Sequence, residues 1–327
     1  MLGMKKRNYK IIIKMKKQLN KVFMAFGTGK ESTEGGSIKR YIGVAPVFVL
    51  GVNPSKAELE ELYGGISIEN EPEYVGTSEV GTEDSKKTVP QVRIDFVVKT
   101  DPEKCEGIEM VNKVTFFLKQ EYRFNSDHSK VQIIDKYGRT AWATPEEVKA
   151  KSIPQYTSGP ANIDPDYRPA YIGEEELTEF IKAYLNIPSP QNYVKKQWVD
   201  KSPKEKAEAE ARLDNILNYF KGDVKELKSL LSYQPNNKVK VLFGVKTTDD
   251  NKQYQAVYTQ KFLKNSINDY SRLDKEVKER KDAGGYPNTE FVVGPLKEYG
   301  VEATLFGTSS IDSSEDPFAL PASPWGV

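Results

Sequence analysis

The stretch from Val89 to Thr144 constrains the fold of this chain more than any other. Apolar residues alternate with polar or charged ones between Val92 and Val98, and again between Val114 and Phe124. Such period-two alternation, rich in β-branched and aromatic residues, predicts β-strands. Turn-rich segments, DPEKCEG and NSDHS, follow these runs. A third run, KVQIIDKYGRTAWAT, is expected to fold back at residues 135–139 as a hairpin, so the sequence predicts a three-stranded antiparallel meander.

The composition excludes several kinds of site. The chain of 327 residues is 29% charged, and no apolar run approaches the roughly 20 residues that a membrane-spanning helix needs. It has one cysteine, Cys105, and one histidine, His128, whereas a structural zinc site takes about four such ligands. We therefore expect a globular protein with no internal disulfide, no zinc site and no membrane span. One thiol is consistent with a reducing compartment.

The charge is distributed unevenly. Residues 1–23 carry eight Lys or Arg and no acid, whereas the rest of the chain carries 40 cations against 47 anions. A signal peptide and a DNA-binding arm are two interpretations of this segment, but the apolar stretch Ile11–Ile13 is short for a signal peptide. We favour translation from Met24 and interpret residues 1–38 as a flexible lead. Because the remaining chain is mildly acidic, a nucleic-acid site would have to be a local basic patch.

The order of the central elements predicts an α+β fold with an oligonucleotide-binding (OB) type of five-stranded antiparallel barrel. The strands would be 89–100, 111–124, 130–143, 238–247 and 253–262, with a helix at 174–185 between the third and fourth. The core domain would span residues 39–308. A helical insertion at 188–235, including a helix from Ser202, would precede the fourth strand, and residues 309–327 would form a disordered tail.

Segments before the barrel receive simpler interpretations. Residues 41–53 form an apolar run typical of a strand. Asn53 and Pro54 are expected to cap and begin a short helix that ends at Gly64. Residues 69–87 are acidic and rich in Gly, Ser and Thr, which predicts a loop.

The predicted strands carry cations and aromatic rings, which are the residue types that single-stranded nucleic acid requires. Cations bind phosphates, and each base stacked on a ring contributes about 1–3 kcal/mol. Ordinary alternatives stay open, because strand lysines usually form a solvated face and Trp142 suits the core as well as a stacking platform. Phe116 and Phe124 are assigned to the core. The candidate DNA-binding residues are Arg93, Phe117, Lys119, Arg123, Lys130, Tyr137, Arg139, Trp142, Lys240, Lys246, Tyr254, Tyr258 and Lys261.

From about Lys39 to Phe306 the chain resembles the single-stranded-DNA-binding proteins of large tailed bacteriophages, notably crAss-like phages. The similarity is carried by KRYIGVAPVFVLGVNPSKAELEELYG, VQIIDKYGRTAWAT, RPAYIGEEELTEFIKAYLNIP and VKVLFGVKTTDDNKQYQAVYTQKFLK. It implies an OB core that coats single-stranded DNA during replication or recombination in the cytoplasm of the bacterial host. It also implies no cofactor, and the Cys/His cluster of the zinc-bearing members is absent from this sequence.

The C-terminal tail resembles the acidic, apolar-tipped tails with which such proteins contact a helicase, primase or polymerase. Asp316 and Phe318 fit that pattern, but the chain continues to Trp325 and ends at Val327, so a partner that reads the carboxyl end would meet a different sequence. A plain solubilising tail is the equal alternative. If the acidic tail competes with DNA, deletion of residues 309–327 should raise DNA affinity at low salt.

Two other functions compete with DNA binding. A catalytic triad could use only His128, which lies in a predicted turn, and acid pairs such as Asp164 with Asp166 also lie in turn-like stretches. We therefore expect no enzyme activity. The alternative is a phage structural or protein-binding module, which salt-dependent DNA binding would distinguish.

Overall fold

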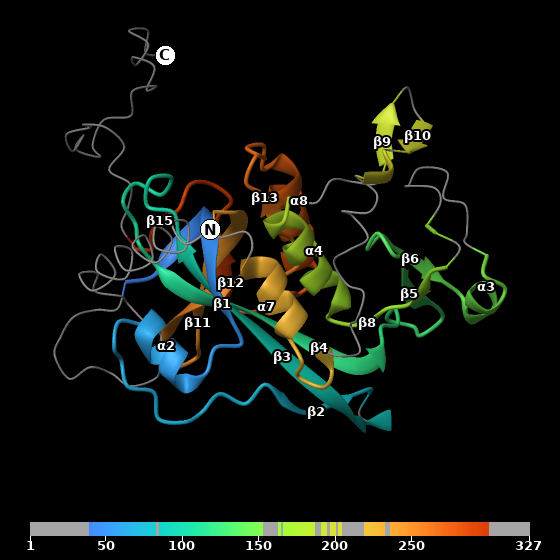
Figure 1. Cartoon of the computed structure of the whole chain (residues 1–327), viewed down its shortest axis with the longest axis horizontal. Helices are drawn as coiled ribbons and strands as arrows, with labels where there is room; N and C mark the ends of the chain where they lie inside the picture. The colour runs from blue at the N-terminus through green and yellow to red at the C-terminus, as the bar shows by residue number, and fades with distance from the viewer. Residues whose placement is uncertain are drawn as a thin grey trace, which may run out of the picture.

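The computed structural model describes residues 39–82, 85–152, 163–164, 166–186, 191–194, 197–200, 202–204, 219–232 and 236–300. A ten-stranded sheet of antiparallel pairs forms the centre of this part of the protein. Its main path runs in the order β12 (Gln253–Val257), β11 (Val239–Thr247), β1 (Tyr41–Val52), β3 (Lys87–Thr100), β4 (Val111–Tyr122) and β8 (Tyr171–Ile172). Shorter strands extend it: β13 (Leu263–Lys264) and β14 (Thr289–Phe291) pair with β11, β15 (Lys297–Glu298) with β1, and β2 (Val75–Val80) with β3. The long strands twist, and the sheet curls into an open half-barrel (Figure 1).

Two helices, α4 (Glu174–Tyr184) and α7 (Lys225–Ser232), cover one face of the sheet (Figure 1). The alternating residues of β3 and β4 supply the sheet side of this core, as the sequence predicts. Helix α4 contributes Phe180, whose ring centroid lies 4.5 Å from that of Phe96 and 5.5 Å from that of Phe116. Because each buried aromatic side chain removes a large apolar area from water, this core fixes which face of β3 and β4 is internal.

The opposite face is covered only in part by the described chain. Helix α2 (Lys56–Leu62) places Leu59 against Val97 of β3. Helix α8 (Ser271–Asp282) packs Leu273 against Leu242 of β11. Between α2 and the far end of β4 this face remains accessible, and Phe117 of β4 is 47% exposed there.

Smaller elements surround the main sheet. Strands β5 (Val131–Ile134) and β6 (Thr140–Ala143) form the predicted hairpin and join β7 (Arg168–Pro169) in a three-stranded sheet. Helix α3 (Pro145–Lys149) follows, with a capping box between Thr144 and Glu147. Strands β9 (Gln191–Val194) and β10 (Gln197–Asp200) pair with each other. The predicted helical insertion 188–235 contains α7, but β9 and β10 are strands, so it is not purely helical. Residues 205–218, which hold most of the helix expected from Ser202, lie outside the described residues.

Two local predictions are wrong. The segment 69–87, expected to be a loop, contains β2, which pairs with β3 from Val75↔Val92 to Val80↔Lys87. The N-cap of α2 is Ser55, not Asn53. Asn53 has a positive φ of 42° and uses its side chain on β3, where it donates to the carbonyl of Arg93 and accepts from the N–H of Asp95.

The sheet uses its strands in an order that the sequence does not reveal. Strands 89–100 and 238–247 are separated by β1, which pairs with both. The predicted third strand, 130–143, belongs to the small sheet through β5 and β6. The mixed class with a curled antiparallel sheet is therefore confirmed, and a closed five-stranded barrel stays a prediction.

Candidate nucleic-acid interface

The accessible face of β3 and β4 brings together three of the predicted DNA-binding residues. Arg93 lies directly opposite Phe117, and Lys119 lies opposite Gln91, one step along the same face. Directly opposite side chains of an antiparallel pair have Cβ atoms about 4.5–5.5 Å apart. We call the surface formed by Arg93, Phe117 and Lys119, together with Tyr74 and Lys113, the β3–β4 patch.

Phe117 is the central ring of the β3–β4 patch. Strand alternation points Phe116 into the helix-covered core and Phe117 out of the other face. Its exposed fraction of 47% is the largest of any described phenylalanine. Its backbone pairs with Arg93 of β3, and β8 pairs with β4 from Lys119 onward, so the accessible ring stands on a strand inside the sheet.

The cations around Phe117 are only partly neutralised. The buried carboxylate of Asp95 accepts from the Thr115 hydroxyl at 2.9 Å and lies 3.3 Å from Arg93 Nε and 3.7 Å from Lys113 Nζ. One carboxylate therefore serves two cations. Lys119 adds a third, whose ammonium has no ion-pair partner among the described residues.

Tyr74 holds the guanidinium of Arg93. The guanidinium carbon lies 5.1 Å from the Tyr74 ring centroid, and the Tyr74 hydroxyl donates to the carbonyl of Pro54 at 2.7 Å. Burial, together with the charge of Asp95, raises the pKa of Tyr74 to about 12, although Arg93 acts against this shift. The hydroxyl therefore remains a hydrogen-bond donor at neutral pH, and the ring fixes where Arg93 points.

A second group of predicted residues lies around the small sheet, where most charges are already matched. Arg123 Nη1 donates to Glu175 at 3.0 Å and to Glu176 at 3.1 Å. Arg139 is held by Asp135 through its Nε at 2.6 Å, and its guanidinium also lies 5.1 Å from the ring centroid of Tyr137. These arginines serve the structure first, because releasing them would leave carboxylates without their partners.

Two further predicted residues extend this second group. Trp142 is half-buried on β6, opposite the buried Gln132. Lys130 is half-buried after the turn, and its ammonium has no partner among the described residues. Phe124, assigned to the core from sequence, is 37% exposed instead and stacks on His128 at 5.5 Å.

A third group, on β11, β12 and the residues just after β12, contains two residues that are too buried to meet a ligand. Tyr258 is fully buried, in the core formed with Tyr286 and Phe291. Lys240 is 6% exposed, and its ammonium donates to Asn268 Oδ1 at 2.8 Å. The predicted contacts of these two side chains with DNA do not fit this burial.

The remaining residues of the third group differ among themselves. Lys261 lies 3.4 Å from Glu179 on α4. Lys246 and Tyr254 lie opposite each other, and both are exposed.

This exposed pair is far from the β3–β4 patch. Gly43 of β1 lies opposite Phe243, whereas Val52 lies opposite Phe96. At about 3.3 Å per residue these ends of β1 are roughly 30 Å apart. The predicted residues therefore do not form one groove.

Sequence reasoning missed two members of the β3–β4 patch. Tyr74 lies in the segment interpreted as a loop, and only the pairing of β2 with β3 places it beside Arg93. Lys113 could have been found, because it has the same strand parity as Phe117 and Lys119. The predicted tail contacts Asp316, Phe318 and Trp325 lie outside the described residues.

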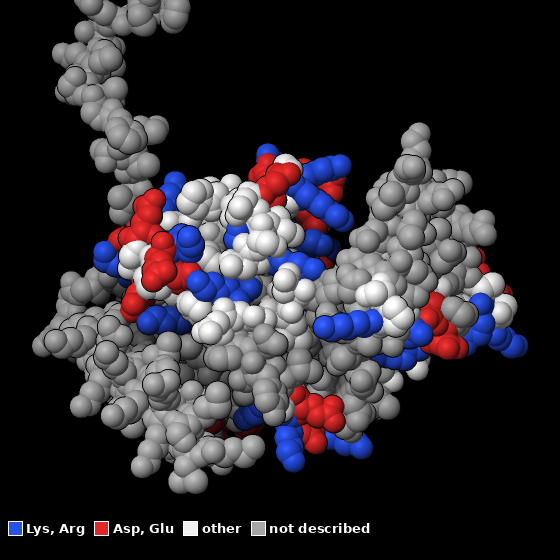
Figure 2. Space-filling view, turned by 45° about the horizontal axis from the view of Figure 1, so that its top comes forward, with Lys and Arg blue, Asp and Glu red and all other residues white. Residues whose placement is uncertain are grey.

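The face drawn in Figure 2 carries both signs of charge. Basic and acidic side chains of the described residues occur there in small groups. Within the described chain, no group of three or more His, Cys, Asp or Glu residues converges as a metal site would require. None of the described helices is both long and apolar enough to cross a membrane.

Comparison with protein-family models, with curated proteins and with solved structures gives no significant match. The β3–β4 patch is therefore interpreted from its own geometry.

Proposed function

We propose that this protein binds single-stranded DNA and coats it during replication or recombination, with the β3–β4 patch as its primary contact. The observation that carries the proposal is the exposed ring of Phe117, which lies opposite Arg93 and two residues from Lys119 on the same face of the sheet. A base stacked on such a ring contributes about 1–3 kcal/mol, and the flanking cations would bind the adjacent phosphates.

The arrangement favours a single strand over a duplex. Bases in a duplex are already stacked on each other, whereas the exposed Phe117 ring would stack with an unpaired base. The curled sheet would then be used as OB barrels are used, with nucleic acid lying across the strands. Such binding tolerates many sequences, because every base has a π-face.

A titration of the full chain into fluorescein-labelled oligo-dT, at several salt concentrations, tests the proposal. We expect tight binding, resistance to an unlabelled duplex competitor, and a log-affinity that falls linearly with log salt by about 0.7 per phosphate contact. Absence of binding at low salt by folded protein would contradict the proposal. The phage structural or protein-binding alternative would then become the leading one.

The N-terminal cations need a control, because residues 1–23 carry eight Lys or Arg and would bind DNA without any folded site. Each measurement is therefore compared with the Phe117→Ala variant of the same full chain, in which those cations are unchanged. Equal affinity of the two proteins would show that the β3–β4 patch is not the contact.

A further inference from the structure

The carboxylate of Asp95 is buried beneath the β3–β4 patch and pairs with two of its cations. Its side chain is 2% exposed, whereas the side chains of Arg93 and Lys113 are 31% and 43% exposed. Asp95 Oδ1 lies 3.3 Å from Arg93 Nε, and Oδ2 lies 3.7 Å from Lys113 Nζ. The anion is therefore enclosed by the protein, while the cations that it pairs with reach the surface on which DNA would lie.

The arrangement around Asp95 depends on hydrogen bonds that a neutral side chain could also make. The Thr115 hydroxyl donates to Asp95 Oδ1 at 2.9 Å, and an amide oxygen would accept the same bond. The Asn53 side chain accepts from the N–H of Asp95 at 2.8 Å and donates to the carbonyl of Arg93 at 3.1 Å. These contacts hold the backbone of β3 whatever the charge at position 95.

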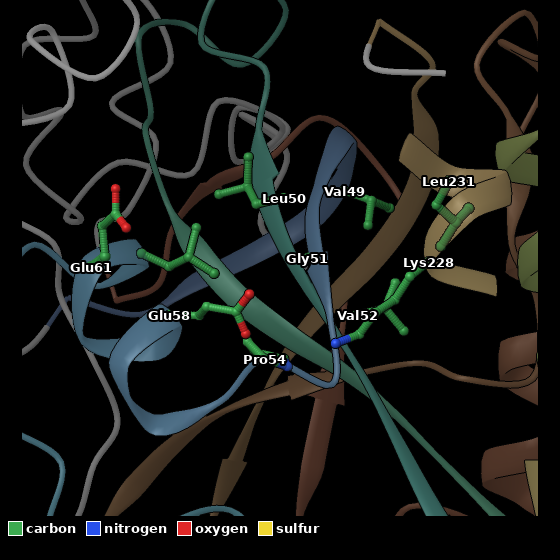
Figure 3. A pocket seen from close by; sticks show the side chains of 10 residues that line it. Val49, Leu50, Gly51, Val52, Pro54, Glu58, Glu61, Lys228 and Leu231 are labelled. Carbon is green, nitrogen blue, oxygen red and sulfur yellow. The ribbon is translucent and has the colours of Figure 1, made fainter. Parts of the chain in front are cut away.

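Arg93 is also oriented by a group other than this carboxylate. Its guanidinium carbon lies 5.1 Å from the ring centroid of Tyr74, whose hydroxyl donates to the carbonyl of Pro54. Pro54 lies in the turn between β1 and α2, beside a cavity of about 500 Å³ (Figure 3). Lys228 of α7 reaches this turn and donates to the carbonyl of Asn53 at 3.2 Å. Loss of the carboxylate's charge would therefore leave the direction of Arg93 largely unchanged.

A phosphate held by Arg93 and Lys113 would lie close to the same carboxylate. Two like charges repel each other, and water and salt screen this repulsion less where one of the charges is buried. The carboxylate also cancels about one unit of the charge that the two cations offer, so fewer counterions are exchanged when DNA binds.

We propose that Asp95 limits the affinity of the β3–β4 patch for single-stranded DNA, because it shares Arg93 and Lys113 with the phosphates. The inference rests on the proposed function and names a residue that sets the strength and the salt dependence of the contact. Loss of this charge should accordingly strengthen binding, whereas loss of a residue that only supports the fold would weaken binding or leave it unchanged.

The Asp95→Asn variant of the full chain tests the inference in the same titration with fluorescein-labelled oligo-dT. We expect its affinity at low salt to exceed that of the parent protein at least about threefold, and its log-affinity to fall more steeply with log salt by about 0.7. The matched control is Asp101→Asn, which removes another buried carboxylate, the partner of Lys238, just beyond the end of β3. It changes the net charge equally but lies roughly 20 Å along the chain from Asp95, so its affinity should stay within about twofold of the parent protein.

The converse variant, Gln91→Glu, adds a carboxylate to the β3–β4 patch. Gln91 is half-buried and lies directly opposite Lys119, whose ammonium has no ion-pair partner among the described residues. Opposite Cβ atoms about 4.5–5.5 Å apart place the new charge within reach of that ammonium. We expect the affinity at low salt to fall at least about threefold and the salt dependence to become shallower by about 0.7. This variant keeps the inference open to contradiction if Asp95→Asn does not fold.

Thermal unfolding midpoints establish which variants are folded. Equal or weaker binding by folded Asp95→Asn overturns the inference alone, as does unchanged binding by Gln91→Glu. An equal rise in the affinity of Asp101→Asn also overturns it, because net charge and not the position of the carboxylate would then be responsible. A parent protein that does not bind oligo-dT overturns the proposed function and, with it, this inference.

Discussion

Phe116 and Phe117 are neighbours on β4, yet they lie in opposite environments. The ring of Phe116 is 3% exposed and has ring centroids of Phe96, Phe180 and Phe262 within 5.7 Å. The ring of Phe117 is 47% exposed and lies across from Arg93. The difference arises because α4 packs over Phe116, whereas the elements on the other face leave Phe117 partly accessible. On β4, therefore, the ring on the helix-covered face stabilises the fold, and the ring on the other face is available to contact a ligand.

Alanine substitution at each ring should separate the two roles most strongly. Phe116→Ala should lower the free energy of unfolding by about 3–5 kcal/mol, because it removes a fully packed ring and leaves a cavity. Phe117→Ala should change it by less than about 0.5 kcal/mol, as surface substitutions usually do. Denaturant unfolding of both variants measures the difference, and equal destabilisation would mean that Phe117 is a core residue.

Substitution of single lysines on the two faces should give a smaller difference, in DNA binding instead of stability. Lys119→Gln should weaken oligo-dT binding and reduce the slope of log-affinity against log salt by about 0.7, because one phosphate contact is lost. Lys261→Gln is the matched control, since Lys261 is already paired with Glu179. If the two substitutions reduce the slope equally, the β3–β4 patch has no special part in phosphate binding.

Low pH should lower the free energy of unfolding, because Glu179 of α4 loses its charge. Burial raises the pKa of this carboxyl, but Lys182 and Lys261 outweigh burial and hold the pKa below the ordinary 4.5. Ionised Glu179 therefore stabilises the fold at neutral pH, and this contribution is lost as the pH falls through the lowered value. Glu179→Gln should be less stable than the parent protein at pH 7, with the gap closing below pH 4.5. Thermal midpoints across that range measure the effect, and a gap that does not change with pH would contradict it.

The smallest expected effect is on the chemical reactivity of Cys105, which depends on the burial of its thiol. Burial, assisted by the charge of Asp101, raises the pKa of its thiol to about 11. Almost no thiolate exists at pH 8, so iodoacetamide should label the folded protein far more slowly than the unfolded protein. Mass spectrometry of timed samples follows the labelling, and rapid modification of the folded chain would show that this region opens.

Much of the fold could be predicted because the alternation of β3, β4 and β11 directly encodes a buried face. Helix α4 was equally clear, since Leu177, Phe180 and Ile181 have helical spacing and all are buried. Strand β2 was missed because its side chains are mostly exposed, so no apolar alternation marks it. Residue type also misplaced Tyr258 and Lys240, because strand parity gives the side of a sheet but not what covers it. Helix α8 packs in the core that contains Tyr258, and residues 267–270 before α8 enclose the Lys240 ammonium. The position of β1 between β3 and β11 depends on long-range pairing, which local patterns do not reveal.

The affinity of Phe117→Ala for oligo-dT, measured beside Tyr254→Ala, tests the central claim most directly. Both remove a partly exposed ring from a strand, but the Tyr254 ring lies near the other end of β1 from the β3–β4 patch. We predict that Phe117→Ala loses about 1–3 kcal/mol of binding free energy, or roughly 5- to 150-fold in affinity, while Tyr254→Ala changes little. Unchanged binding by folded Phe117→Ala, or an equal loss in the two variants, would contradict the assignment of the β3–β4 patch as the DNA contact.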